Sequence, residues 1–406
     1  MSPAPFTSRN ARNLAGMVAT LPWPPNAVVL ARNAVSLRRE RPWTGFAGRD
    51  PARLTELAEA GLRWFARSQD AVGSGGVGDF RFQGWTPGYP EVTGYIIPTM
   101  LDWAARLSRD DLRGRAIRMA EWELGIQQPD GGFESWYEGE GRPPVVFNTG
   151  QVIRGLVRAA AETGEERFLD GARRAGDWII SGQEPDGSFS KGNYLDMTRV
   201  YDVYATAALA QLAKASGDDR YARAALANAE FAVSQQLPNG WFDLCDNVPE
   251  GNATPSTHTL GYTADGLLEI GTLLDEPELV AAGELTARAL LDQVEPGGRL
   301  PGRFDRNWSP AAEYVVLTGS SQLGILLALI HTRTAEADLI EGAWALLDFV
   351  AYCQHLNSVG SNRRGALTGS YPVWGRYVPL KYPSWATKFY LDHIRLLLEA
   401  DTPSSA

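Results

Sequence analysis

Two kinds of helical pattern alternate along the chain. In the first, apolar residues recur three and four positions apart with Arg, Asp and Glu between them, which predicts amphipathic helices with one buried face. These segments span 51–69, 111–128, 167–183, 219–236, 279–294 and 335–354. In the second kind most positions are apolar, so these helices must be buried on most sides. These segments span about 93–107, 148–163, 199–214, 258–273, 318–332 and 384–399.

A short phrase of Gln, a tight turn, Gly and an aromatic residue follows each amphipathic segment. It is clearest at Gln127–Phe133, Gln183–Phe189 and Gln235–Phe242, and weaker copies begin at Gln69, Gln293 and Gln354. Pro-Asp-Gly in the first two copies suits a tight turn, because Pro fixes φ and Gly accepts a positive φ. The copies recur about every 50–65 residues, the length of two helices and two connections.

The repeat predicts an all-α fold, an (α/α)6 toroid of six outer–inner helix pairs. No terminal pair has the polar outer face that caps an open solenoid, so we expect a closed ring. The toroid should occupy residues 51–400, and residues 1–50 should form an N-terminal arm.

The two ends of this toroid should differ. Each long loop follows an outer helix and precedes an inner one, so the long loops and the inner-helix N-termini lie at the same end. Unpaired N–H groups give those termini partial positive charge. The reverse connections, such as 163–166 and 216–219, are short and polar. Function is therefore expected at the long-loop end.

The long loops and the first turns of the inner helices combine aromatic with polar residues. Aromatic rings stack on the apolar faces of sugars while polar groups bind their hydroxyls, so this lining favours a carbohydrate ligand. The bland alternative is that these side chains cap helices and pack the loops. The candidate substrate-binding residues are Trp85, Tyr89, Tyr95, Trp136, Gln151, Tyr201, Trp241, Asp305, Trp308, Gln322, Trp374, Trp385 and Lys388.

Composition narrows the setting. The formal net charge is −10 and the sequence pI is about 5.1, which argues against a nucleic-acid partner and mildly against a polyanionic substrate. The two cysteines cannot form a disulfide framework. No apolar run is long enough to span a membrane, and Trp23-Pro24-Pro25 interrupts the only stretch that resembles a signal peptide. We expect a cytoplasmic protein.

Several phrases in these loops resemble a bacterial family of VpsJ-type polysaccharide biosynthesis proteins, also described as prenyltransferase- or squalene-cyclase-like repeat proteins. The phrases are Tyr89–Ile97, Phe147–Gln151, Thr257–Tyr262, Leu300–Asp305, Gly369–Gly375 and Tyr382–Lys388. The resemblance covers residues from about 50 to 400. It implies an α/α toroid connected with exopolysaccharide production, and it carries no catalytic assignment.

Two reaction types fit a glycan-acting enzyme. Epimerisation or β-elimination of a uronic acid needs a base, an amide or cation for the carboxylate and often a Tyr acid, for which Asn148, Arg199, His258 and Tyr262 are candidates. Hydrolysis needs two carboxylates across the glycosidic bond, for which Glu91, Asp202, Asp243 and Asp305 are candidates. His258 is distinctive because it opens an inner helix, where the helix dipole favours a neutral imidazole.

Two other classes of function remain open. A prenyltransferase or terpenoid cyclase would share the repeat, and Asp243 and Cys245 could hold zinc with His258 or His331. The Asp-x-Asp-Asp acid motif of squalene-type cyclases is missing, however, and Cys245 could equally be a buried apolar residue. A non-catalytic glycan-binding protein would keep the aromatic residues alone. We expect no metal and no cofactor.

Overall fold

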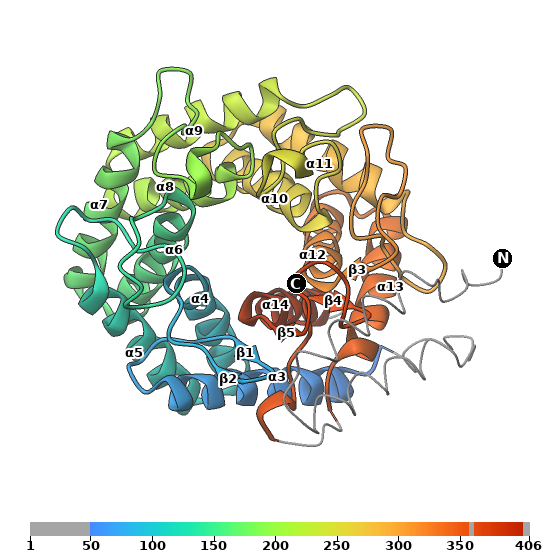
Figure 1. Cartoon of the computed structure of the whole chain (residues 1–406), viewed down its shortest axis with the longest axis horizontal. Helices are drawn as coiled ribbons and strands as arrows, with labels where there is room; N and C mark the ends of the chain where they lie inside the picture. The colour runs from blue at the N-terminus through green and yellow to red at the C-terminus, as the bar shows by residue number, and fades with distance from the viewer. Residues whose placement is uncertain (1–48, 357–360, 401–406) are drawn as a thin grey trace.

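The computed structural model describes residues 49–356 and 361–400, and its helices form two concentric rings (Figure 1). The outer ring consists of α3 (Pro51–Val72), α5 (Asp110–Ile126), α7 (Glu166–Ser181), α9 (Asp219–Ser234), α11 (Pro277–Leu291) and α13 (Ala337–Cys353). The inner ring consists of α4 (Pro90–Leu107), α6 (Val146–Thr163), α8 (Asp202–Ser216), α10 (Thr257–Leu274), α12 (Leu317–Thr334) and α14 (Ser384–Ala400). The predicted (α/α)6 toroid is confirmed, and the expected arm over 1–50 lies almost wholly outside the described residues.

The two rings differ in burial as the sequence pattern indicated. Helix α7 buries Phe168, Leu169, Ala172, Ala175 and Ile179, which lie on one face, and its charged residues lie on the other. Helix α12 is buried along most of its length, from Leu317 to Ile330. Within the described part of the chain, no helix is long and apolar enough to cross a membrane.

Short turns reverse the chain from each inner helix to the next outer one. Helices α6 and α8 end at Gly164 and Gly217, whose φ angles are 72° and 70°. Glycine adopts this left-handed conformation without steric cost, which lets the helix stop and the chain turn back at once. Both short connections fall where the sequence predicted them.

The repeated Gln joins neighbouring helix pairs. The side-chain nitrogen of Gln183 donates to the carbonyl oxygens of Gly187, in its own turn, and of Ala224, in the next outer helix. Gly187 has a φ of 85°, and a Cβ there would lie 2.1 Å from the Ala227 carbonyl oxygen. The same contact with the next outer helix recurs from Gln69 to Arg115, from Gln127 to Gly171, from Gln236 to Ala282 and from Gln354 to Leu57.

The last of these contacts closes the ring, because Gln354 follows α13 and Leu57 lies in α3. Helix α14 also packs against both α3 and α4, so the sixth helix pair meets the first (Figure 1). In the fourth copy of the repeat Gln236, and not the expected Gln235, makes the contact with α11. Gln293 does not make it and instead donates to Ala289 of its own helix.

Short strands that the sequence pattern did not predict connect the long loops. Strands β1 (Phe80–Arg81), β2 (Gly84–Trp85) and β5 (Lys381–Tyr382) form an antiparallel sheet in the order β2-β1-β5. Strands β3 (Val315–Val316) and β4 (Ser370–Tyr371) form a second pair. Single 3-10 turns lie at η1 (Tyr194–Asp196), η2 (Pro249–Gly251) and η3 (Ser361–Arg363). Loops far apart in the sequence therefore share one end of the ring.

Candidate functional site

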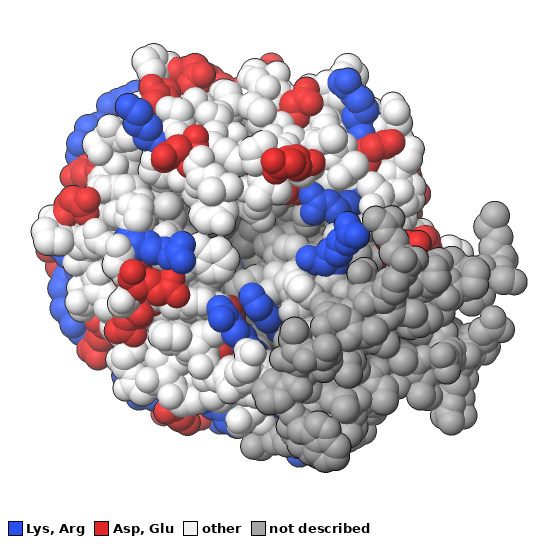
Figure 2. Space-filling model, viewed as in Figure 1, with Lys and Arg blue, Asp and Glu red and all other residues white. Residues whose placement is uncertain are grey.

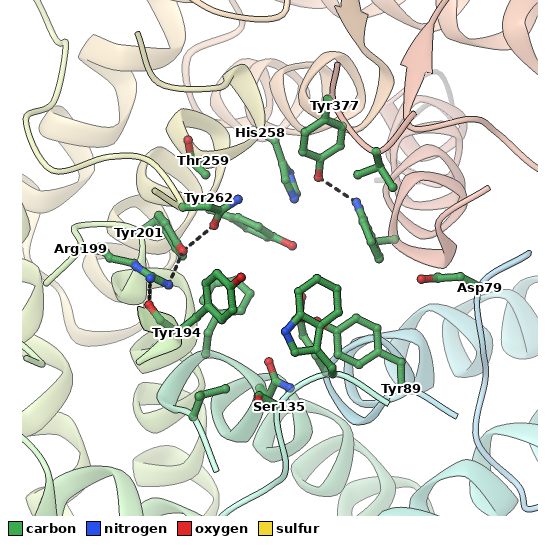
Figure 3. Close-up of a pocket in the computed structure, with 18 of the residues that line it drawn as sticks. Asp79, Tyr89, Ser135, Tyr194, Arg199, Tyr201, His258, Thr259, Tyr262 and Tyr377 are labelled. Atoms are coloured by element: carbon green, nitrogen blue, oxygen red, sulfur yellow. Dashed lines mark hydrogen bonds between the residues drawn. The ribbon is translucent and has the colours of Figure 1, made fainter. Parts of the chain in front are cut away.

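A cavity of about 310 Å³ opens at the end of the toroid where the inner helices begin. Figure 2 shows it as a hollow at the centre of the ring, with Lys and Arg side chains around its rim. In the close-up, His258, Tyr262 and Tyr377 lie on one side and Tyr89 and Ser135 on the other, while Arg199 and Asp79 lie at opposite ends (Figure 3). The cavity lies at the end of the ring where the long loops were expected to place function.

His258 lies in the first turn of α10 with its imidazole facing the cavity. Its backbone N–H donates to the side chain of Ser256, the N-cap residue of α10, which fixes the start of the helix. Nδ1 is 2.7 Å from Oε1 of Gln322 in α12, and the residue is 5% exposed. Because an amide oxygen only accepts, Nδ1 carries the proton and Nε2 keeps its lone pair.

The imidazole of His258 stays neutral at physiological pH. Burial lowers its pKa to about 4, because the charged form loses its hydration, and the hydrogen bond to Gln322 only partly opposes that effect. A buried neutral imidazole with a free Nε2 lone pair can accept a proton from a ligand.

Two tyrosines flank His258. The ring centroid of Tyr262 is 4.2 Å from that of His258, and the Tyr377 centroid is 5.5 Å away. The indole N–H of Trp385 donates to the Tyr377 hydroxyl over 2.9 Å. Burial raises the pKa of both tyrosines well above the ordinary value, so both hydroxyls stay protonated and can donate.

Glu91, in the first turn of α4, supplies a carboxyl group to the cavity. The Tyr89 hydroxyl donates to its Oε2 over 2.5 Å. Burial, together with the negative charge of Asp79, raises the pKa of Glu91 to about 7, although the hydrogen bond from Tyr89 opposes the shift. Near neutral pH this carboxyl group can therefore donate or accept a proton.

Arg199 lies at the end of the cavity opposite Asp79 (Figure 3), and Asn148 also lines the cavity. Nη1 of Arg199 donates to the Tyr201 hydroxyl over 2.8 Å, and Nη2 donates to the Tyr194 carbonyl oxygen. The Asn148 amide nitrogen donates to the carbonyl oxygen of Glu134 over 2.9 Å. Both side chains are held in place by these bonds, so they present a fixed cation and a fixed amide to the cavity.

Aromatic rings form the wall between these ends. Trp136 stacks on Tyr89 with a centroid distance of 6.4 Å and an interplanar angle of 9°, and Trp385 meets Tyr89 edge-on. Trp136 adopts a φ of 64°, which is rare for a non-glycine residue and costs backbone energy. A flat aromatic wall beside polar groups is the arrangement that binds the apolar face of a sugar.

The structure brings about half of the predicted site residues together. The candidates that line the cavity are Tyr89, Glu91, Trp136, Asn148, Arg199, Tyr201, His258, Tyr262 and Trp385. Others do not line it but are bonded within the surrounding ring of helices: Gln322 to His258, Tyr95 beside Glu91 and Tyr262, Asp202 to Asn193, Gln151 to Arg154, and Lys388 to Asp392.

The remaining candidates do not line the cavity. Asp305 accepts backbone hydrogen bonds from Asn307 and Ser309 in its own turn, and Trp308 donates to the Asn239 carbonyl oxygen. Trp85, Trp241 and Trp374 are partly or fully buried elsewhere in the loops, where Trp85 packs against Trp64 and Phe80. Their placement favours the packing and capping interpretation for these five residues.

Several cavity residues were not among the candidates. Thr259 belongs to the phrase Thr257–Tyr262, so its polar character was a usable signal, whereas Tyr377 lies between two of the phrases quoted above. Asp79 and Lys381 gave no signal in the sequence, because short strands bring them to the mouth of the cavity from the first and last loops. The other unexpected lining residues are Ser135, Tyr137, Val145, Phe147, Tyr194, Asn247 and Val378.

The alternative zinc site does not fit its proposed ligands. The side chain of Asp243 is exposed, whereas Cys245 is fully buried with Sγ 3.5 Å from the Thr263 hydroxyl. Burial raises the pKa of the Cys245 thiol to about 12, which disfavours the thiolate that binds zinc. Among residues 49–356 and 361–400, no group of three or more His, Cys, Asp or Glu is placed to hold a metal ion.

A comparison with curated proteins finds similarity to a longer protein. No protein-family model matches the chain. A squalene–hopene cyclase from Zymomonas mobilis is 26% identical over 289 residues, which are 64% of this chain and 41% of that protein. The chain thus spans less than half the length of this curated relative.

Solved structures share the ring over most of the chain. A heparin-specific unsaturated glucuronyl hydrolase has a TM-score of 0.68 at 11% identity, covering 86% of this chain and 98% of that one. Cellobiose 2-epimerase from Bacillus thermoamylovorans has a TM-score of 0.67 at 10% identity, covering 85% and 99%. The unsaturated glucuronyl hydrolase of Bacillus sp. GL1 has a TM-score of 0.64 at 15% identity, covering 84% and 96%. At these identities the likeness establishes the α/α toroid fold.

Proposed function

We propose that this protein is a carbohydrate-active enzyme that removes a proton from a ring carbon of a sugar, in epimerisation or β-elimination. The proposal rests on one observation: the candidates for proton abstraction line one cavity together, whereas most of the candidates for hydrolysis do not. Asn148, Arg199, His258 and Tyr262 all line one cavity. Of the carboxylates expected for hydrolysis, Glu91 alone lines it among the described residues.

The contacts support a division of roles. Nε2 of His258 accepts the proton from a carbon next to a carbonyl or carboxylate group, while Gln322 holds the proton on Nδ1. Arg199 and Asn148 stabilise the negative charge that develops on the adjacent oxygen. In epimerisation an acid returns a proton to the opposite face of the carbon. In elimination the acid protonates the leaving oxygen as the neighbouring C–O bond breaks. Tyr262 and Glu91 are the acids within the cavity.

Hydrolysis is a second candidate that one observation favours. Glu91 and Asp79 both line the cavity, and burial raises the pKa of each. A carboxyl group with a pKa of about 7 suits a general acid. Asp79, however, already accepts hydrogen bonds from the Tyr137 hydroxyl and from the Ser384 N–H, which leaves it less suited to activate water.

The wider setting is part of the proposal. The resemblance to VpsJ-type proteins supports a substrate in bacterial exopolysaccharide production, and several neighbours with this fold are named as enzymes of sugars. The match to the cyclase instead supports terpenoid chemistry within the same kind of ring. A glycan-binding protein without catalysis would need the aromatic wall but no neutral, oriented His258.

Isotope exchange tests the proposed reaction. The full chain is incubated in D2O with a panel of uronate-containing oligosaccharides, and NMR follows deuterium at ring carbons and any new double bond. We expect exchange or elimination in the wild type and a loss of roughly 10²–10⁴-fold in His258→Gln with sugar binding retained. His331→Gln is the matched control, because His331 bonds the Glu336 carbonyl oxygen outside the cavity.

Each of the other outcomes would support an alternative function. Cleavage without deuterium at carbon, lost in Glu91→Gln, would establish hydrolysis in its place. Conversion of squalene by the wild type would establish the cyclase interpretation. Binding of oligosaccharide with no turnover in any assay would leave a glycan-binding protein.

A further inference from the structure

A pair of cations lies at the Asp79 end of the cavity, where the first and last loops of the toroid meet. Strand β1 pairs with β5, which makes Arg81 and Lys381 direct cross-strand partners. Their Cα atoms belong to loops about 300 residues apart in sequence, and short antiparallel strands hold them side by side. Lys381 is partly buried and lines the cavity.

The two cations differ in what they bind. Nη2 of Arg81 donates to the Tyr137 hydroxyl over 3.0 Å, and the guanidinium lies over the Tyr137 ring at 5.1 Å. For the Lys381 ammonium group, no hydrogen bond or ion pair is found among residues 49–356 and 361–400. A partly buried ammonium group without a partner is costly, because it has lost part of its hydration and gained nothing in exchange.

The nearby carboxylates do not neutralise Lys381. Asp79 uses Oδ2 to accept from the Tyr137 hydroxyl and Oδ1 to accept from the Ser384 N–H. Glu91 accepts from Tyr89 and is half protonated near pH 7. Burial, and then the positive charge of Arg81, lower the pKa of Lys381 from its ordinary value, while Asp79 opposes the shift only in part. An anion bound at Lys381 would supply the negative charge that the nearby carboxylates do not provide.

We propose that Lys381 binds the carboxylate of an acidic sugar, so that the substrate of this site is a uronate-containing glycan and not a neutral one. This inference rests on the proposed function. The site suits one negative charge, since Lys381 lines the cavity and Arg81, whose Nη2 donates to Tyr137, does not. Asp79 and Glu91 in the same cavity would repel a second charge, which disfavours a phosphate dianion.

The position of Lys381 also explains how a long acidic glycan could lie in the cavity. Arg199 and Asp79 mark opposite ends of the site in Figure 3, and Lys381 shares the Asp79 end. The aromatic wall of Trp136 and Tyr89 lies between them. While the reacting sugar faces His258 with its own carboxylate toward Arg199, a neighbouring sugar of the same glycan can direct its carboxylate toward Lys381.

Matched ligands test the inference. Oligomers of glucuronate, galacturonate and mannuronate are compared with their carboxyl-reduced forms, which differ only by carrying hydroxymethyl groups, in calorimetric titrations of the full chain. We expect at least one acidic oligomer to bind roughly tenfold or more tightly than its reduced form, with the preference falling as salt rises. Lys381→Gln should abolish the preference and leave binding of the reduced form unchanged. Lys381→Arg should retain it.

Lys214→Gln is the matched control, because Lys214 is exposed near the end of α8, at the opposite end of the ring. Thermal unfolding of each variant verifies that the ring is intact. Equal affinity for the acidic and reduced forms, or a Lys381→Gln variant that keeps the preference, would overturn the inference and leave the proposed function standing. Displacement by inorganic phosphate at lower concentration than by glucuronate would overturn it in favour of a phosphate site. If no oligosaccharide of either form binds, the proposed function fails and this inference fails with it.

Discussion

His258 combines three properties that rarely occur together in one histidine. It is nearly fully buried, Gln322 fixes the proton on Nδ1, and burial holds its pKa at about 4. Each property follows from its place in the first turn of an inner helix, where the side chain faces the ring axis.

Replacing Gln322 by Leu should reduce kcat about tenfold, which corresponds to losing one oriented hydrogen bond of about 1.4 kcal/mol. The physical reason is that Nδ1 loses its acceptor, so the imidazole can adopt the other tautomer. Gln322→Glu should keep the tautomer and raise the pKa of His258, because a carboxylate favours the imidazolium. The acid limb of the pH–rate profile would then move to higher pH. A purely structural Gln322 would leave that limb in place.

Glu91 provides a test through the pH dependence of stability. Burial keeps the proton on the folded side chain, since its pKa rises from the model-peptide value of 4.5 to about 7. Between these values the folded chain binds more protons than the unfolded chain, so this residue lowers the free energy of unfolding as pH increases. Relative to the wild type, Glu91→Gln should become more stable between pH 4.5 and 7, by at most about 3 kcal/mol. Urea unfolding at both pH values measures this difference, and a constant difference would contradict the shift.

At the residue scale, the sequence predicted which residues belong to the site better than it predicted the contacts between them. His258 and Gln322 were each recognised because a polar side chain near the start of an apolar helix needs an explanation. Their mutual hydrogen bond was not predicted, because they lie 64 positions apart and no periodicity relates them. Tryptophans were overassigned to the cavity, since an aromatic residue that packs a loop has the same sequence signature as one that binds a sugar.

The helical elements owe their positions to signals that the chain repeats. The predicted helix boundaries agree with the structure to within about three residues at nearly every end, because apolar spacing and Gly-containing turns both mark them. The short strands at the mouth were missed, since two residues are too few to show alternation. Those strands set the positions of Arg81 and Lys381, so the sequence analysis missed this part of the site as well.

The repeated Gln should be worth measurable stability. In Gln183→Leu the carbonyl groups of Gly187 and Ala224 lose their donor, and the free energy of unfolding should fall by about 1–3 kcal/mol. Gln293→Leu is the control at another copy of the repeat, because within residues 49–356 and 361–400 the Gln293 side chain donates only to Ala289 of the preceding helix, at 3.4 Å. Gln293→Leu should lower the free energy of unfolding by less than about 1 kcal/mol. Equal losses in urea unfolding would show that the contact with the next helix contributes nothing.

At the scale of the whole molecule, one end of the ring carries the cavity and the other carries short turns. Net charge alone suggested that an acidic sugar would be disfavoured, yet several Lys and Arg side chains lie beside the hollow in Figure 2, among Asp and Glu. The total charge of −10 describes the entire surface, whereas a ligand experiences the local field of the mouth. The fold could be predicted because its repeat runs through the whole chain, while the local field depends on a few loop residues.

Inserting a short Gly-Ser segment should separate folding from activity. Between Gly217 and Asp218, at the short-turn end, an insertion should leave both the thermal midpoint and turnover nearly unchanged, since a Cβ on Gly217 would meet nothing within 4 Å. Between Tyr194 and Leu195 the chain is equally exposed, but Tyr194 lines the cavity and accepts from Arg199. That insertion should keep the midpoint and abolish turnover. Equal activity in both proteins would contradict the assignment of function to one end.

The Gln contacts that join each helix pair to the next have a consequence for how such proteins diversify. These contacts use side-chain amides and backbone carbonyl groups of the turns and outer helices, and none of the bonding Gln residues lines the cavity. Residues that line the cavity can therefore be substituted without breaking the hydrogen bonds that join neighbouring helix pairs. The same ring occurs in solved structures that differ from this chain at almost nine positions in ten.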